Sequence, residues 1–476
     1  MIRRPLVLAL ALTLLPAAAS AEDLLQTYEA ARQGDPQLSA AQANRQVSQE
    51  DRVQARARML PSLTGEARLN RSRSFSKSSG NVGSDPNDPT ARLPFGTNIE
   101  TNSTQRNYSI NATQMIYNRA VIKGFESQSA LTESSDFTLE SASQQLITRT
   151  SSAYFAVLVA LENLAAAEAA ETALQKQFDY ASKRLEVGLA PITDVHEARA
   201  QYDDARARTI TTRNQVEDSY QALSEITGQP VRTLKALPAD FKPALPEAQN
   251  MDTWVNNAIQ NNPSLRAQEL TVRAAEIGIE TARAGHWPTL TLGAGYGDSA
   301  SWGDARVGSL PSEDTRSSGS RGPSIGLTLS VPLYSGGAVQ SGVRQALARR
   351  DAAQDEFERQ KRLLVRNTRN AYQVLVAGIS EVEARRLAVV SAQAAYDASQ
   401  VGLEVGTRTV LDVLNNQRTL LQAQQAYAQS KYNFLQNRLL LEQSAGSLDV
   451  ADVQDINRLL TADAATNLAP PPASVQ

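Results

Sequence analysis

The sequence contains one long segment twice. Residues 178–195 read FDYASKRLEVGLAPITDV, and residues 396–413 read YDASQVGLEVGTRTVLDV. Gly188 and Gly406 occupy the same place in the two copies, 218 residues apart, and the copies still match at Gly228 and Gly446, where they end. Repetition on this scale constrains architecture more than any single residue does. Each copy is predicted to form a long helix, a glycine-containing turn and a second long helix.

The repeat extends upstream of these helical hairpins. Asp35-Pro36 matches Asn262-Pro263, and Leu60-Pro61 matches Trp287-Pro288, both 227 residues apart. The spacing between the copies changes chiefly between residues 64 and 109, which indicates loops of different length. We therefore interpret the chain as a tandem duplication of about 220 residues.

The N-terminus has the features of a secretory signal. Residues 1–21 contain Arg3 and Arg4, an apolar run from Leu6 to Leu15, and a small-residue cleavage site ending at Ala21. The apolar run is shorter than the ~20 residues of a membrane helix, and no later stretch is expected to qualify. An exported chain with no cysteine forms no disulfides.

Composition offers little material for catalysis or for nucleic-acid binding. The formal net charge is −3, whereas nucleic-acid binders normally show a basic footprint. The only histidines are His196 and His286. His196 lies between Asp194 and Glu197, but adjacent residues of a helix do not share a face. We expect no catalytic residues, no metal site and no cofactor.

Two segments are predicted to be unusually long helices. Residues 118–187 and 337–405 contain no proline and are rich in helix-forming residues. Apolar residues recur every seven positions, which is typical of coiled-coil packing. In the second copy they are Leu375, Val382, Val389, Tyr396 and Leu403, then Val413, Leu420, Tyr427, Phe434 and Leu441; the first copy has Val195, Tyr202, Thr209, Val216 and Leu223.

Short segments before each hairpin alternate between apolar and polar residues. Residues 289–296 and 324–333 do so clearly, and residues 63–69 and 108–112 repeat the pattern in the first copy. Such alternation is the signature of a transmembrane β-strand. An ordinary half-buried strand of a soluble sheet gives the same pattern.

The context of these strands favours a membrane barrel shared between chains. The polar segments 71–104 and 298–322 are expected to be long loops on one side, and Trp287 and Trp302 lie near the expected strand ends. Four strands cannot close a barrel, for which about 8 are needed. Open edges are not tolerated in lipid. The sequence thus predicts an obligate oligomer of two, three or four chains.

The signal, the duplicated strand–strand–hairpin units and the paired glycine turns together closely resemble the TolC family of outer-membrane channel-tunnel proteins. The resemblance runs from about Asp23 to Gly446. It implies an α+β membrane protein: a trimeric 12-stranded outer-membrane β-barrel, with four strands per chain, continued by a long α-helical periplasmic barrel of coiled-coil hairpins.

The resemblance also implies a function and partners. The protein would be the exit duct of tripartite efflux or type I secretion systems, not an enzyme. Its partners would be two further copies of the chain, a periplasmic adaptor (membrane fusion) protein, an inner-membrane RND, ABC or MFS transporter, and outer-membrane lipid, but no nucleic acid. The expected organisation is a signal peptide (1–21), a first repeat (22–228), an equatorial linker (229–251), a second repeat (252–446), and an equatorial segment with a disordered tail (447–476).

The resemblance places a gate at the two turns. Closure in the family uses bonds between neighbouring hairpins, and the matching positions are Thr193, Asp194 and Arg408. A charge-assisted Asp–Arg contact is directional and releasable. Plain turn capping and solvation would also explain these residues.

The constriction of the family carries two rings of aspartates. Asp412 matches the first ring, whereas Asn415 stands at the second, and Glu197 could supply compensating charge. Leu403 stands where the gate of the family uses a tyrosine. The hairpin tips are the expected adaptor-docking sites, namely Gly188, Leu189, Ala190 and Pro191 in the first copy and Val405, Gly406 and Thr407 in the second.

Two other classes of protein are alternatives. A soluble periplasmic coiled-coil adaptor or scaffold would explain the helices, but such adaptors carry a compact lipoyl-like or β-barrel domain between the hairpin arms, and none is recognisable. A periplasmic hydrolase would need a Ser/His/Asp or metal cluster, and two isolated histidines do not suggest one.

Overall fold

The computed structural model describes residues 23–464 except 86–87, 239–240, 246–249 and 308–309. The expected signal peptide and the expected C-terminal tail lie outside the described residues. The chain divides into two compact units. The helical unit comprises residues 1–46, 133–269 and 355–476, and the sheet unit comprises residues 47–132 and 270–354.

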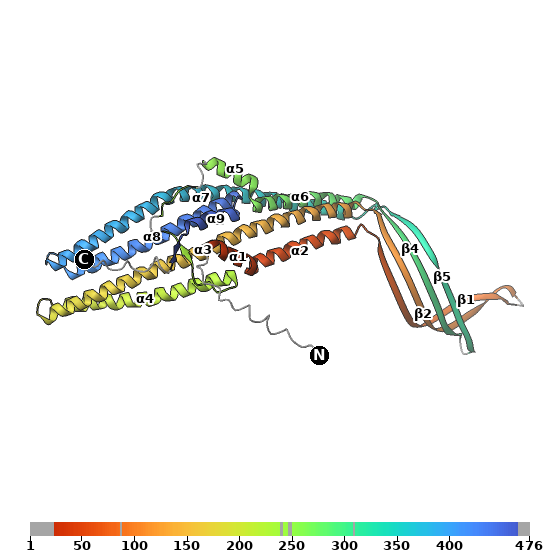
Figure 1. Ribbon diagram of the computed structural model, residues 1–476. Coiled ribbons are helices and arrows are strands. Elements are labelled where there is room, and N and C mark those ends of the chain that lie inside the picture. Colours follow the sequence, from red (N-terminus) through yellow and green to blue (C-terminus); the bar gives the residue numbers. More distant parts are fainter. Residues whose placement is uncertain (1–22, 86–87, 239–240, 246–249, 308–309, 465–476) are drawn as a thin grey trace, which may run out of the picture. The chain divides into compact units, whose positions relative to one another are not determined.

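The two predicted helical hairpins are present. The first consists of α3 (Arg119–Glu186) and α4 (Ile192–Thr227), and the second of α7 (Ala338–Glu404) and α8 (Val410–Ala445) (Figure 1). Burial confirms most of the heptad positions, whereas Val389, Tyr396, Tyr427, Val195 and Tyr202 are half-buried. Leu375, Val382 and Leu403 on α7 are buried, as are four of the five predicted positions on α8. The weaker first-copy series is buried at Thr209, Val216 and Leu223.

Each hairpin packs against a short helix from its own copy. Helix α1 (Leu24–Gly34) contacts α4, and α5 (Met251–Asn261) contacts α8. The approach is close in both copies. A Cβ at Gly34 would lie 2.3 Å from the Thr227 carbonyl oxygen, and a Cβ at Gly446 would lie 2.6 Å from that of Asn261. The following helices are α2 (Pro36–Ala57) and α6 (Pro263–Arg283), and η1 (Ala284–His286) extends the second.

The core of the helical unit lies where α3 meets α8. Tyr154 and Leu158 of α3 and Leu435 and Leu439 of α8 are all buried. One stretch of α3 is long and apolar enough to cross a membrane, contrary to our expectation that no helix would qualify. Because many of its side chains belong to this core, bundle packing explains its composition.

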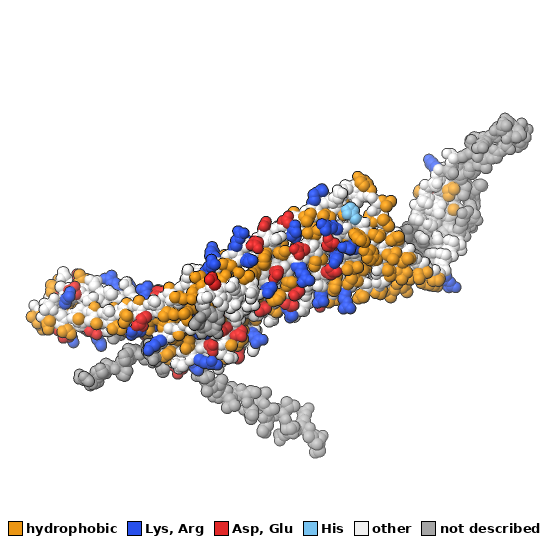
Figure 2. Space-filling model, turned by 90° about the horizontal axis from the view of Figure 1, so that it is seen from above, with side chains coloured by type: hydrophobic (Ala, Val, Ile, Leu, Met, Phe, Trp, Pro, Cys, Tyr) orange, Lys and Arg blue, Asp and Glu red, His pale blue; other side chains and the backbone are white. Residues whose placement is uncertain are grey.

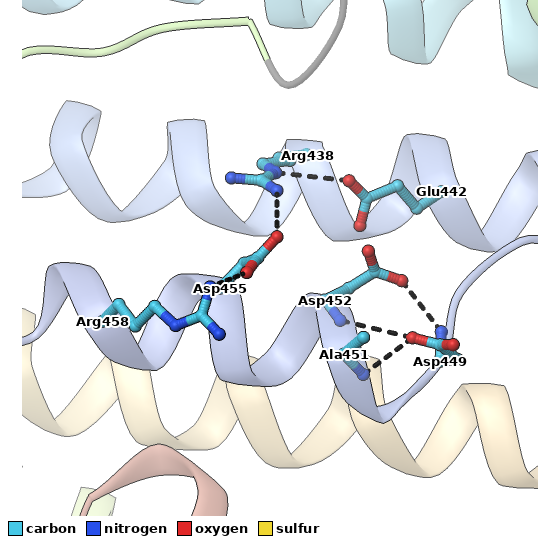
Figure 3. A network of polar contacts seen from close by, with 7 residues as sticks. All are labelled: Arg438, Glu442, Asp449, Ala451, Asp452, Asp455 and Arg458. Carbon is cyan, nitrogen blue, oxygen red and sulfur yellow. Dashed lines mark hydrogen bonds and ion pairs between the residues drawn. The ribbon is translucent and has the colours of Figure 1, made fainter.

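The junction after α8 carries a network of charges (Figure 3). Helix α9 (Val450–Leu459) begins at a capping box formed by Asp449 and Asp452. Arg438 donates to Glu442 Oε1 at 3.2 Å and lies 3.9 Å from Asp455. Burial, and then the negative charge of Asp452, raise the pKa of Glu442 to about 7 despite Arg438. Beside α9, β3 (Lys235–Ala236) pairs with β6 (Ala462–Asp463).

The sheet unit contains one antiparallel sheet in the order β1-β2-β4-β5. The strands are β1 (Ser62–Asp85), β2 (Asp88–Tyr117), β4 (Thr289–Val307) and β5 (Leu310–Ser330). Residues that face each other across an antiparallel ladder lie on the same face. The register therefore decides whether the apolar residues of the four strands lie on the same face of the sheet.

The apolar residues of the four strands do lie on the same face. One row of paired residues consists of Leu63, Ala112, Ala294 and Ile325, and adjacent rows on the same face contain Ile110 with Tyr296 and Leu292 with Leu327. The other face carries polar and small residues, as in the row Thr64, Asn111, Gly295 and Ser324.

The apolar face is exposed. Ile325 is 80% exposed, and Leu63, Leu327 and Leu329 are also strongly exposed. The sheet thus presents an apolar band to its surroundings. Figure 2 shows few charged side chains on the described part of the sheet, whereas both signs are interspersed over the helices.

The predicted long polar loops were wrong. Residues 71–85 and 88–104, and most of 298–322, continue the two ladders, with Arg71 opposite Thr104 and Gly297 opposite Gly322. Trp302, expected near a strand end, lies within β4 opposite Thr104. Polar residues suit these strands because they pair across the ladder. The Ser72 and Ser103 hydroxyls are 3.0 Å apart, Arg73 donates to Glu100 at 2.6 Å, and Arg106 lies 3.1 Å from Asp298.

Candidate functional site: the two hairpin tips

The first tip joins α3 to α4. Gly188 has a φ of +75°, a left-handed conformation that favours glycine. The Leu189 N–H donates to the Arg184 carbonyl at 2.7 Å, and the Arg184 guanidinium donates to the Leu189 carbonyl at 3.2 Å. Arg184 therefore closes the first tip by holding both ends of the turn.

The second tip joins α7 to α8. Its turn has the same backbone hydrogen bonding as the first, but Arg408 takes the place of Arg184 as the side chain that lies against the turn. Gly406 has a φ of +77°, and the Thr407 N–H donates to the Gly402 carbonyl at 2.8 Å. Gly402 stands where the first copy has Arg184. A Cβ at Gly402 would lie 2.6 Å from Cγ of Arg408, so the absence of a side chain lets Arg408 cross the end of α7.

The two predicted aspartates have different surroundings. Asp412 forms a capping box with Thr409, whose backbone N–H and hydroxyl both donate to Oδ2, at 2.9 and 2.8 Å. These hydrogen bonds, with the nearby charge of Arg408, lower the pKa of Asp412. Asp194 has the same place in α4, but its N-cap residue is Pro191, which has neither an N–H nor a hydroxyl. Within the described part of the chain, the Asp194 carboxylate receives no side-chain hydrogen bond from its cap.

The remaining predicted residues are dispersed over the tips. Thr193, Glu197 and Arg408 are exposed, and Asp194 and Asp412 are half-buried. Asn415 is exposed and accepts a hydrogen bond from Arg418 at 2.7 Å. The described residues of the single chain contain no ion pair between Asp194 and Arg408.

Leu403 is part of the second tip's own small core. It is 7% exposed and packs with Val410, Val413 and Leu414. A tyrosine at this position would have to fit into that cluster. The larger tyrosine ring would therefore disturb the packing of the tip.

Both tips expose apolar side chains. Val187 and Leu189 in the first tip and Val405 in the second are 67–68% exposed, and Ile192 and Leu411 are also exposed. Among the predicted docking positions, Gly188, Pro191, Gly406 and Thr407 are exposed and Ala190 is half-buried. An apolar group at the end of a hairpin, with no cover in the chain itself, is suited to binding another protein.

Two features of this site were not predicted from the sequence. The capping box was readable as Thr409-Val410-Leu411-Asp412, a Ser/Thr followed three residues later by an acid at a helix start. The role of Gly402 was not readable, since it depends on the path of the Arg408 side chain. His196 lies exposed on α4, and the described residues contain no group of three His, Cys, Asp or Glu placed to hold a metal.

Comparison with known proteins adds independent information. The sequence matches the protein family described as "Outer membrane efflux protein" over residues 27–229 and 254–447. It is 33% identical over 467 residues to the outer membrane protein TolC of Escherichia coli, which covers 97% of this chain and 90% of TolC. It is 27% identical to the proteases secretion protein PrtF of Dickeya chrysanthemi, over 95% of this chain and 94% of PrtF.

The fold also matches a solved channel. The outer-membrane channel OprN superposes with a TM-score of 0.70, covering 89% of this chain and 90% of OprN at 20% sequence identity. At that identity the likeness concerns the fold alone.

Proposed function

Because the chain belongs to the outer membrane efflux protein family, we propose that three copies of it form one duct for efflux, type I secretion or both. The protein is an outer-membrane exit duct with a large periplasmic part. Members of the family are channel proteins rather than enzymes, and the proposal assigns this chain no catalytic step. Its relatives include TolC and a protease secretion protein, so both classes of cargo are within the proposal.

The observation that carries this proposal is the apolar band of the sheet. Four strands place their apolar residues in register on one face, and that face is exposed. Its other face is polar, as the lining of a water-filled lumen must be. Strands β1 and β5 leave two edges without a partner within the chain's sheet. Lipid does not tolerate open edges, so we propose that β5 of one copy pairs with β1 of the next, closing a 12-stranded barrel.

The helical hairpins would then form the periplasmic tunnel. We propose that segments 229–251 and 447–465, which include β3, α9 and β6, belong to its equatorial girdle. The exposed apolar side chains of the tips support docking of a periplasmic adaptor, which would connect the duct to an inner-membrane RND, ABC or MFS transporter.

The tips would also hold the gate. Asp194 is not engaged by its own cap, and Arg408 is exposed at the end of the neighbouring hairpin. A contact between Asp194 of one hairpin and Arg408 of another would be charge-assisted and releasable. Asp412 is proposed to line the constriction, where a ring of carboxylates favours cations.

Planar-bilayer conductance of the detergent-purified protein, with its mass measured alongside, tests the duct. We expect cation-selective channels from a species of three chains. A water-soluble monomer or dimer without channel activity would contradict the proposal.

The gate has its own test. Asp194→Ala and Arg408→Ala are each expected to raise the resting single-channel conductance, since each removes one side of the closing contact. Asp203→Ala, which removes an exposed carboxylate further along α4, serves as the control. If neither charged variant alters the conductance, the gate is elsewhere.

A further inference from the structure

The internal repeat is packed unequally within one chain. Helix α3 of the first copy packs on α8 of the second: the Gln436 amide donates to the Thr148 carbonyl at 3.2 Å, and the Gln144 amide donates to the Gly446 carbonyl at 3.3 Å. The counterparts of α3 and α8 are α7 and α4. By the same repeat, α7 should pack on an α4, and a single chain offers it none in that position.

The exposed face of α7 identifies the missing contact. Gln144, Thr148 and Ser151 of α3 are 6%, 7% and 1% exposed. Their counterparts, 218 residues later, are Arg362, Arg366 and Arg369, and all three are exposed. Positions that are buried on α3 are therefore exposed at the equivalent places on α7.

Helix α4 leaves open the matching face. Tyr432, Leu435 and Leu439 of α8 are buried against the first copy, whereas their counterparts Asn214, Glu217 and Gln221 of α4 are exposed. On the same side of α4 lie the counterparts of Gln436 and Gln443, which are Asp218 and Glu225.

The two open faces have opposite charge. The α7 face carries three arginines, and the α4 face carries Asp218 and Glu225. Among the described residues, none of these five side chains has a partner of opposite charge; Arg366 has only a 3.5 Å contact with Asn367. The corresponding positions of α3 and α8 are uncharged. Within the chain, side-chain amides therefore join α3 to α8, and we call this packed contact a seam. At the equivalent positions of α7 and α4, where the repeat predicts a second seam, the side chains are charged.

We propose that the arginine face of α7 binds the acidic face of α4 on a second copy of this chain. The repeat sets the register. Arg366 faces Asp218 of the next copy, as Thr148 faces Gln436. Arg362 reaches Glu225 and the C-terminal carbonyls of α4 at Gly228, as Gln144 reaches Gly446. The contact is head-to-tail, which closes into a ring under cyclic symmetry. The inference rests on the proposed trimer but specifies its helical seam.

Cysteine pairs test the register directly, since the native chain has no cysteine. A chain with Asp218→Cys and Arg366→Cys, treated with a mild oxidant or a short bis-maleimide, is expected to yield covalent dimers and trimers. The matched control, Thr148→Cys with Gln436→Cys, is expected to keep the mass of one chain because that seam is internal. Co-expressed single-cysteine chains should stop at dimers.

Charge reversal tests the energetics. Arg366→Asp and Asp218→Arg are each expected to lower the trimer fraction at low salt at least tenfold, and the double variant should restore it to within about twofold. Arg386→Asp is the control on the same helix, because its counterpart Glu168 is exposed in the first copy. High salt should weaken the parent trimer more than the double-cysteine cross-linked form.

The possible outcomes distinguish a failure of the proposed α7–α4 contact from a failure of the proposed duct. A native trimer with channel activity that never cross-links at positions 218 and 366, and that tolerates both reversals, would overturn the seam and leave the duct intact. A parent chain that forms no oligomer would overturn the duct first.

Discussion

The two copies of the repeat share a backbone plan but satisfy their polar groups differently. At the tips, the second copy binds its own aspartate, because Thr409 caps α8 with Asp412, whereas Pro191 leaves Asp194 without that partner. At the opposite ends of the hairpins, the second copy has a half-buried Arg438 bonded to the buried Glu442, where the first has Tyr220 and Ser224. Duplication preserved the apolar spacing, and the polar positions diverged.

The largest expected effect on stability comes from Glu442, whose counterpart in the first copy is an uncharged serine. Its carboxyl has an ordinary pKa of 4.5 and a folded-state pKa of about 7. Between these values the folded chain binds more protons than the unfolded chain, so stability falls as pH rises. Glu442→Gln should therefore raise the free energy of unfolding above pH 7 by on the order of 3 kcal/mol, and flatten the dependence of stability on pH between pH 5 and 7. Melting temperatures in detergent across this range measure it; an unchanged slope would contradict the assignment.

The next effect separates the ways in which the tips close. Gly402→Leu should destabilise the second tip by roughly 1–3 kcal/mol, because the new side chain would collide with Arg408. The equivalent first-tip change, Arg184→Leu, removes one exposed hydrogen bond and a cation–π contact with Tyr180, and should cost less than that. Limited proteolysis at the two turns reads out each tip separately. Equal sensitivity of both variants would show that the tips close alike.

Exchanging the caps should exchange the behaviour of the aspartates. Pro191→Thr offers Asp194 a capping box and should stabilise α4 by about 1 kcal/mol, while diverting the carboxylate from the proposed gate. We therefore expect a raised resting conductance in a more stable protein. Thr409→Ala should cost about 1 kcal/mol at α8. A Pro191→Thr channel as tightly closed as the parent would mean that Asp194 does not act in the gate.

The smallest effect is expected at Asp412. Its pKa is lowered from 3.8, so its capping contribution is present above that value and is lost as pH falls through the lowered one. Asp412→Asn should abolish this acid dependence and reduce cation selectivity, measured as the reversal potential in a salt gradient. Asn415→Asp is the converse variant and should increase selectivity. Unaltered selectivity in both would place these residues away from the pore.

Much of the fold could be predicted from the sequence because it depends on periodicity. Seven-residue spacing located Leu375, Val382 and Leu441 in the core, and strict alternation located the strands. The extent of the strands could not be predicted in this way. Ser-, Asn- and Arg-rich segments resemble loops until their cross-strand partners, such as Glu100 for Arg73, are known. The tips were located from their glycines, but the clearance between Gly402 and Arg408 depends on a side-chain path that no local pattern encodes.

The two open edges of the sheet have a genetic consequence. Each chain supplies both β1 and β5 to the proposed ring, so a chain with one damaged edge would spoil one of the three junctions that close the barrel, and a chain damaged at both edges would spoil two. In a cell making native and damaged chains in equal amounts, most rings would contain at least one damaged chain. Edge mutations are therefore expected to be dominant, whereas mutations that only unfold the chain before assembly would be recessive, because such chains never enter a ring.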